Sequence, residues 1–143
     1  MWVGMVRINL VDVSKLSDQH LVAEYDEILM LVSYIKRYSK FDGTELKQYC
    51  LGKGHMKFFK DKVLYLKKRH ELLKIEMRKR GFVTRKNIVL STFSKKNIND
   101  WKPTSLDVSI VTKRILSRIK AKFGYYRYYG TVRSYEFFRR MLA

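Results

Sequence analysis

Acidic side chains gather in one short part of a strongly basic chain. Residues 7–34 hold five carboxylates and two cations, whereas the 143-residue chain has 31 Lys and Arg against 13 Asp and Glu, a net charge of +18. A carboxylate that is partly withdrawn from water can stabilise a cationic intermediate or transfer a proton. Charge balance, and the preference of a helix N-terminus for an acid, are the alternative explanation. The five carboxylates are Asp12, Asp18, Glu24, Asp26 and Glu27.

The same stretch has the apolar periodicity of an amphipathic helix. We predict a helix that begins after an N-cap at Ser17 and ends near Tyr38. On this helix His20, Glu24 and Glu27 share a strip at the border between the buried face and solvent, where a carboxylate can be half buried and still touch a ligand. The apolar residues recur at steps of four and three: Leu21, Tyr25, Ile28, Val32 and Ile35.

The length and composition predict one all-α domain over residues 1–143. The hydrophobic content is 46%, which is that of a folded globule, and 143 residues allow one core. Besides the first helix, we predict a second from about Met56 to Arg80 and a third from a Thr104–Asp107 capping box to about Lys122. Long irregular connections are expected at 44–55 and 82–103, an arm at 7–14, and a C-terminal tail at 131–143 that includes a short helix over 134–142. The apolar side of the third helix is expected to hold Leu106, Ile110, Ile115, Ile119 and Phe123.

Positive charge is concentrated in two segments. Residues 53–80 carry eleven cations and three acids, and residues 113–140 carry nine cations and one acid. Such charge predicts a polyanionic partner, with nucleic acid first, an anionic membrane surface second and a ribosomal or chromatin-like packing role third. Lys67, Lys68 and Arg69 spread over the polar arc of the second helix and are candidates for phosphate contact, a solvated face being the alternative. His70 falls in the apolar repeat, and we interpret it as a packed core histidine.

Four tyrosines surround an arginine in the sequence YYRYYG at 125–130. Their rings are suited to stacking on unstacked bases, and the guanidinium is suited to binding phosphate. Tyr126, Arg127 and Tyr128 are therefore candidates for DNA contact. The alternative is packing on the core with hydroxyls in water, and we expect this of at least two of the tyrosines.

The sequence indicates no metal or cofactor. His20, His55 and His70 have no metal-site spacing with Cys50, and neither a phosphate-binding glycine loop nor a serine or cysteine triad is present. Since Cys50 is the sole cysteine, it forms no internal disulfide, which fits a reducing cytoplasm. No apolar run reaches the length of a membrane span, so we expect a cytoplasmic protein without a membrane partner.

Three segments together resemble the pyrimidine-dimer DNA glycosylases, the family founded on a bacteriophage endonuclease V. They are RINL followed by SDQHLVAEYDE, then LGKGHMKFFKDKVLYLKKRHELL, and finally YYRYYG. The resemblance implies a compact domain of three main helices with the N-terminal segment threaded between them. It also implies an enzyme that recognises cyclobutane pyrimidine dimers in double-stranded DNA, removes the damaged base and nicks the abasic site. We expect the protein to be a monomer and to need no cofactor.

The resemblance also implies roles for residues of the first segment. The family's nucleophile is the α-amine of the processed N-terminus, here Val6, whose ordinary pKa of about 8 leaves a neutral fraction near pH 7. The amine forms an imine with the damaged nucleotide, and the carboxylate that matches the Ala-Glu-Tyr-x-Glu motif, Glu27, stabilises it and assists β-elimination. Arg7 would hold a phosphate or the sugar, and Gln19 and His20 match the family's active-site polar pair.

Two departures from the family pattern lie on the first helix. Asp26 and Met30 stand where the family has arginines, so two DNA contacts are missing or relocated. Lesion preference is therefore open, and two other functions stay in view. One is an abasic-site lyase without dimer specificity, and the other is a non-catalytic, architectural DNA-binding protein.

A third departure concerns the start of the chain. Val6 offers an α-amine only if translation begins at Met5 and that methionine is removed. Valine is small enough for this processing, whereas Met1 is followed by the bulky Trp2. We therefore interpret residues 1–5 as an extension that precedes the functional terminus.

Overall fold

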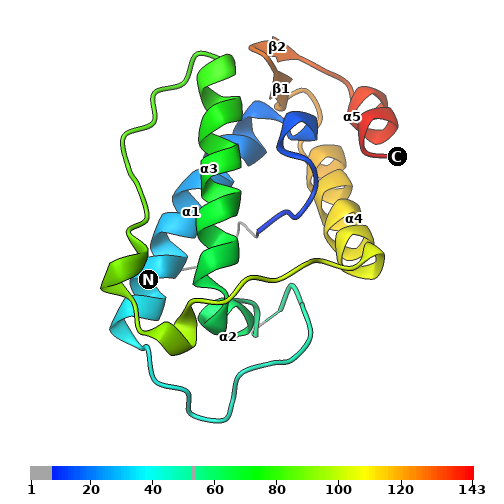
Figure 1. Ribbon diagram of the computed structural model, residues 1–143. Helices are drawn as coiled ribbons and strands as arrows, with labels where there is room; N and C mark the ends of the chain where they lie inside the picture. Colours follow the sequence, from blue (N-terminus) through cyan, green and yellow to red (C-terminus); the bar gives the residue numbers. More distant parts are fainter. Residues whose placement is uncertain (1–7, 53) are drawn as a thin grey trace.

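Three long helices carry the fold (Figure 1), and the mainly-α prediction is confirmed. The computed structural model describes residues 8–52 and 54–143. The long helices are α1 (Asp18–Arg37), α3 (Val63–Lys79) and α4 (Ser105–Ala121). The shorter elements are η1 (Val13–Lys15), α2 (His55–Phe58), η2 (Phe59–Asp61), η3 (Leu90–Thr92), η4 (Lys95–Asn97), β1 (Arg127–Tyr128), β2 (Thr131–Val132) and α5 (Tyr135–Leu142).

Helix α1 lies beside α3 and buries the apolar face that its sequence predicts (Figure 1). The Ser17 side chain caps its N-terminus by accepting a hydrogen bond from the His20 backbone N–H at 3.0 Å. Leu21, Ile28 and Ile35 are fully buried against α3 and the arm. The interior also holds His70, which stacks on Tyr25 with ring centroids 4.6 Å apart, so its interpretation as a core histidine is confirmed.

The single helix predicted from Met56 to Arg80 is interrupted. The chain forms α2 and η2, leaves helical geometry at Lys62 (φ −126°, ψ 34°), and only then begins α3. Phe58 and Phe59, which precede the break, keep helical backbone angles and are 1% and 0% exposed. Both rings pack edge-on against Trp101, which joins this short helical segment to the 82–103 connection.

The N-terminal arm runs between the α1–α3 pair and α4 (Figure 1), as predicted. Ile8 is fully buried, and its backbone is held on both sides: its N–H donates to His55 Nε2 at 3.2 Å, and its carbonyl accepts from the Tyr49 hydroxyl at 2.9 Å. His55 Nδ1 lies 2.7 Å from the Cys50 carbonyl, so Nδ1 carries the proton and Nε2 accepts. The segment that follows the N-terminus therefore has a fixed path.

Helix α4 begins at the predicted capping box, in which Thr104 and Asp107 bond each other's backbone N–H. Its buried face consists of Val111, Ile115 and Ile119. The expectation that Leu106 and Phe123 share that face is wrong, since they are 68% and 84% exposed. Leu106 lies in the first turn, and the helix ends before Phe123.

The C-terminal segment is folded. Strands β1 and β2 pair antiparallel around Tyr129 and Gly130, which have φ values of 52° and 81°, as a tight hairpin turn requires. This small hairpin was not predicted. The predicted final helix is present as α5, whose Phe138 is fully buried. Within the described residues, no helix combines the length and apolarity needed to cross a bilayer.

Candidate active site

Glu24 and Glu27, which we predicted to share one strip of α1, lie in different surroundings. Glu27 follows Ala23 by one turn and His20 by two, and it is 4% exposed, more deeply buried than a border position. Glu24 is fully buried and faces α3. The two acids therefore lie in different surroundings although they are three residues apart.

Glu24 forms a bidentate ion pair with Arg69. Arg69 donates from Nε to Glu24 Oε2 at 2.7 Å and from Nη2 to Oε1 at 3.0 Å, and its Nη1 donates to the Val11 carbonyl at 2.5 Å. Burial alone would lower the pKa of Arg69, but the adjacent Glu24 carboxylate raises it. The predicted position of Arg69 on an outer, phosphate-contacting surface is therefore wrong. Arg69, on α3, instead binds Glu24 of α1 and the Val11 carbonyl of the arm, and so holds both segments against α3.

The other two cations predicted on this surface differ from each other. Lys67 is half-buried and donates to the Ile88 carbonyl at 2.7 Å, which ties the 82–103 connection to α3. Lys68 is exposed and pairs with Asp100 at 2.6 Å. Of the three consecutive cations at 67–69, only Lys68 stays at an open surface, where a screened ion pair costs little to exchange for a phosphate.

A cavity of about 440 Å³ lies between the first turns of α1, the last turns of α4 and the tyrosine motif. Arg114, Arg118 and Lys122 follow one another at steps of four along one of its walls, and none of its lining residues is a carboxylate. The lining residues are Asn9, Gln19, His20, Ala23, Arg114, Ile115, Arg118, Ala121, Lys122, Tyr125 and Tyr126. Such a cavity can hold an anion. Asn9 brings the arm to it, whereas the expected site residues Val6 and Arg7 lie outside the described residues.

His20 forms part of the cavity wall as a neutral imidazole. Its Nδ1 lies 2.8 Å from the Ser17 hydroxyl, and its ring stacks on Tyr126 with centroids 4.9 Å apart and planes 10° apart. Burial, together with the charges of Arg114 and Arg118, lowers the pKa of His20 to about 4. At neutral pH the positive charge of the cavity therefore comes from α4 and not from His20.

Gln19 holds the tyrosine motif in place. Its Nε2 donates to the Tyr125 carbonyl at 2.7 Å, and its Oε1 accepts from the Arg127 backbone N–H at 2.9 Å. Both ends of this amide are thus occupied by the backbone on either side of Tyr126. Gln19 acts as a positioning residue for the cavity wall.

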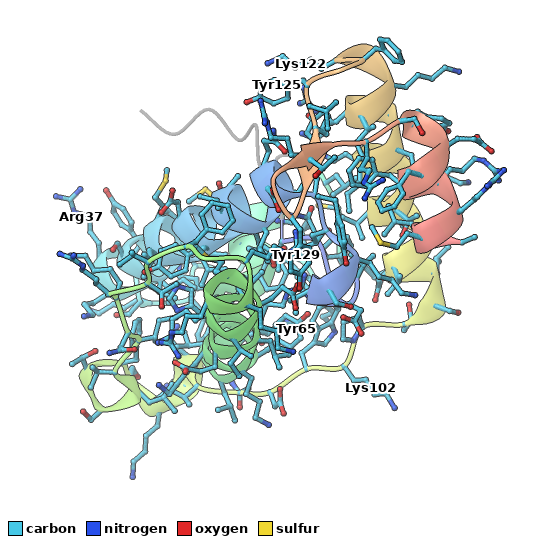
Figure 2. All side chains as sticks on the ribbon, turned by 90° about the horizontal axis from the view of Figure 1, so that it is seen from above. Arg37, Tyr65, Lys102, Lys122, Tyr125 and Tyr129 are labelled. Atoms are coloured by element: carbon cyan, nitrogen blue, oxygen red, sulfur yellow. The ribbon has the colours of Figure 1, made fainter. Side chains whose placement is uncertain are left out.

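The second half of the motif is fastened to α3. Asp18 accepts from the backbone N–H groups of Tyr129 and Gly130 at 3.1 and 2.8 Å and from Arg80 Nη1 at 3.0 Å. The Arg80 guanidinium lies 4.6 Å from the ring centroid of Tyr128, whose hydroxyl donates to the Ser14 carbonyl. Figure 2 shows Tyr129 reaching back toward α3, where its hydroxyl donates to Glu76 at 2.8 Å.

The four tyrosines therefore have different roles. Tyr126 is buried against His20 and Tyr128 is half-buried, so packing of two tyrosines is confirmed. Tyr125 lines the cavity at its outer rim and is 49% exposed. The Arg127 side chain is exposed, and its Nη1 donates to the Gly130 carbonyl at 3.3 Å.

Sequence reasoning missed three residues that build the site. Arg114 and Arg118 could have been found from their spacing of four on a predicted helix that leads directly into the tyrosine motif. His55 had no such signal, because its bond to the Ile8 backbone joins positions 47 residues apart.

The sequence matches a known protein family. A model of the pyrimidine dimer DNA glycosylase family matches residues 5–89, more than half of the chain. The matched span includes the arm, α1 and α3, and hence Glu27 and the Glu24–Arg69 pair. The chain belongs to the pyrimidine dimer DNA glycosylase family.

Proposed function

We propose that this glycosylase cleaves the glycosidic bond at cyclobutane pyrimidine dimers in duplex DNA and then cuts the abasic site through an imine on the Val6 α-amine. The family supports the glycosylase activity on pyrimidine dimers. The observation that carries the rest is the position of Glu27, buried on the α1 face that leads directly to the cationic cavity.

The reaction begins with attack by a neutral amine. The nitrogen of Val6 bonds to C1′ as the glycosidic bond breaks, and the departing base leaves with the bonding electron pair and takes up a proton. Opening of the sugar ring gives a cationic imine. Removal of a C2′ proton then expels the 3′ phosphate, and hydrolysis releases the enzyme.

Glu27 is suited to the charged steps of this sequence. A carboxylate in a site with little water stabilises a cationic imine strongly, because few solvent dipoles compete with it. The same group can accept and return the protons that the elimination moves. Glu24 cannot share this role, since both its oxygens are bonded to Arg69 in the interior.

The arm supports the proposed nucleophile by its fixed path. Tyr49 and His55 hold the backbone of Ile8, two residues after Val6. An anchor so close to the terminus limits the volume that the amine can explore. A nucleophile held near its target reacts far faster than one that must be brought there from a flexible tail.

The cations at the C-terminal end of α4 are the proposed contacts for the DNA backbone. Asp26 and Met30 occupy the α1 positions where the family has arginines, and both are exposed. Arg114, Arg118 and Lys122 line the opposite wall of the cavity at the N-terminal end of α1. We infer that phosphate contacts have moved from α1 to α4, which keeps the backbone of the damaged strand close to Glu27.

Covalent trapping tests this function. Protein that begins at Val6 is mixed with three duplexes that contain a pyrimidine dimer, an abasic site or no damage, with borohydride present to reduce any imine. We expect trapping and strand cleavage on the first two duplexes and neither on the third. Absence of any trapped complex on the abasic duplex would contradict imine chemistry.

A second candidate is an abasic-site lyase without dimer specificity. The exposed acid at Asp26 favours it, because a carboxylate beside the DNA repels phosphates that an arginine would bind. The same three duplexes separate the two candidates. Trapping on abasic DNA alone would support the lyase.

A further inference from the structure

Phe123 is the most exposed large apolar side chain among the described residues, with 84% of its surface in water. It lies outside the stretch that matches the family model. An exposed phenylalanine gains nothing from the hydrophobic effect in the free protein. Isolated exposed apolar residues are common, so its surroundings decide whether Phe123 has a function.

Phe123 lies at the apex of a tight turn that closes α4. The Tyr125 N–H donates to the Lys122 carbonyl at 3.1 Å, which makes residues 122–125 a β-turn with Phe123 in second place. Gly124, in third place, has φ 81°, the left-handed geometry that this position of a type II turn requires. The turn holds the phenylalanine away from the helix.

The turn is anchored on α1. Gln19 bonds the Tyr125 carbonyl and the Arg127 N–H, and Tyr126 stacks on His20. A side chain on such a turn loses less freedom on binding than one on a flexible loop.

The turn also forms the rim of the cationic cavity. Lys122 and Tyr125, which flank the Phe123–Gly124 pair, both line the cavity, and Lys122 Nζ lies 4.3 Å from the Tyr125 ring centroid. Figure 2 shows these two side chains together at the outer edge of the molecule, at the end of α4. Three cations precede Phe123 within five residues: Arg118, Lys120 and Lys122. An exposed apolar side chain at the rim of a cationic cavity is suited to DNA, whose stacked bases lie between two rows of phosphates.

We propose that Phe123 inserts between bases next to the lesion and wedges the step open. This inference rests on the proposed function. Phenylalanine is among the side chains that proteins insert between base steps, and insertion unstacks and kinks the duplex. Damaged steps are cheaper to open than intact ones, so a wedge beside the cavity would favour lesions over undamaged DNA. Arg118 and Lys122 would hold the flanking phosphates while the ring enters the stack.

Stopped-flow fluorescence of 2-aminopurine placed beside a pyrimidine dimer tests the insertion, with the signal read before strand cleavage. Wild-type protein should raise the emission as the probe is unstacked. Phe123→Ala should abolish the rise and weaken lesion binding roughly ten- to a hundredfold, the range of aromatic stacking. Phe123→Tyr, which keeps the ring, should restore both. The matched control is Leu106→Ala, which removes an exposed side chain at the opposite end of α4 and should change neither.

The outcomes separate the wedge from the chemistry. A Phe123→Ala variant with wild-type emission and affinity overturns the wedge, whether or not the protein cleaves dimers. A wild-type protein that gives a Phe123-dependent signal without cleavage keeps the wedge and overturns the proposed function. Loss of binding to phosphatidylglycerol vesicles in Phe123→Ala, with DNA signals unchanged, would overturn the wedge and assign Phe123 to a membrane surface.

Discussion

Positive charge has different surroundings on the two sides of α1. On the side that faces α3, the Arg69 guanidinium meets the Glu24 carboxylate in the interior, and both groups are nearly inaccessible to water. On the side that carries the cavity, the described lining residues include three cations and no carboxylate. The difference shows that a cation of this basic chain can have a structural role, as Arg69 has through its pairing with Glu24, so its position in the sequence alone does not mark it as a DNA contact.

The same division applies to Glu24 and Glu27. Glu24 forms a structural ion pair with Arg69, whereas Glu27 is the carboxylate of α1 that we propose for the chemistry. Substitution of each acid should therefore affect different properties. This contrast is the simplest way to test whether the two sides of α1 have the roles assigned to them.

The largest effect is expected on stability when the interior pair is broken. Glu24→Gln leaves the Arg69 guanidinium buried without its counter-charge, and breaking such a pair costs about 3–5 kcal/mol. Urea unfolding followed by circular dichroism measures the free energy of unfolding. A loss below about 1 kcal/mol would show that water or another group satisfies Arg69.

Glu27→Gln should affect the reaction instead. The substitution keeps the shape and removes the charge that stabilises the imine, so strand cleavage should fall about a hundred- to a thousandfold while lesion binding is retained. Single-turnover cleavage and equilibrium binding on the same duplex measure the two properties. Full activity in a folded Glu27→Gln protein would remove the carboxylate from the mechanism.

Acid should destabilise the protein through its two stacked histidines. Burial lowers the pKa of His20 and of His70 to about 4, aided by Arg114 and Arg118 at the first and by Lys74 at the second. Between pH 6.5 and 4 the unfolded chain therefore binds more protons than the folded one, and the free energy of unfolding falls as the pH is lowered.

His70→Phe isolates one of these contributions. It keeps the stack on Tyr25 and removes the titrating group, so it should recover up to about 3 kcal/mol of the acid-dependent loss. Thermal unfolding at several pH values compares the two proteins. Parallel stability curves for wild type and His70→Phe would show that His70 titrates normally in the folded state.

The cavity cations should affect DNA binding by a smaller amount each. Arg118→Gln removes one proposed phosphate contact, so lesion affinity should fall about tenfold and the slope of log K against log salt should become shallower by about one. Lys67→Gln is the matched control, because Lys67 bonds the Ile88 carbonyl. Equal effects of the two substitutions would mean that the charge of the whole protein, and not the cavity, binds the DNA.

Local sequence signals predicted the parts of the fold that depend on neighbouring residues. Three features were predictable because each involves positions three or four apart: the Ser17 cap, the Thr104–Asp107 capping box and the apolar stripe of α1. The break at Lys62 was not predicted, and neither was the packing of Phe58 and Phe59 on Trp101, because these rings meet across a long separation in the sequence.

The sequence identified several residues of the candidate site but did not predict what they bind. Gln19 and Arg69 were identified as polar groups for DNA, but they bond a backbone 106 residues away and a carboxylate 45 residues away. Partners so distant in sequence leave no periodic signal. The cavity likewise brings residues of α1 and α4 to one place although they lie about a hundred residues apart in the sequence, and no local pattern encodes that arrangement.

Mapping of the covalent adduct tests the central claim most directly. Protein that begins at Val6 and protein that carries residues 1–5 are each treated with dimer-containing DNA and borohydride, and the linked residue is identified by mass spectrometry. We predict efficient trapping of the first form, with the DNA on the α-amine of Val6, and weak or absent trapping of the second, whose Val6 nitrogen is in a peptide bond. Equal trapping of both forms at a lysine side chain would contradict the account and place the nucleophile elsewhere.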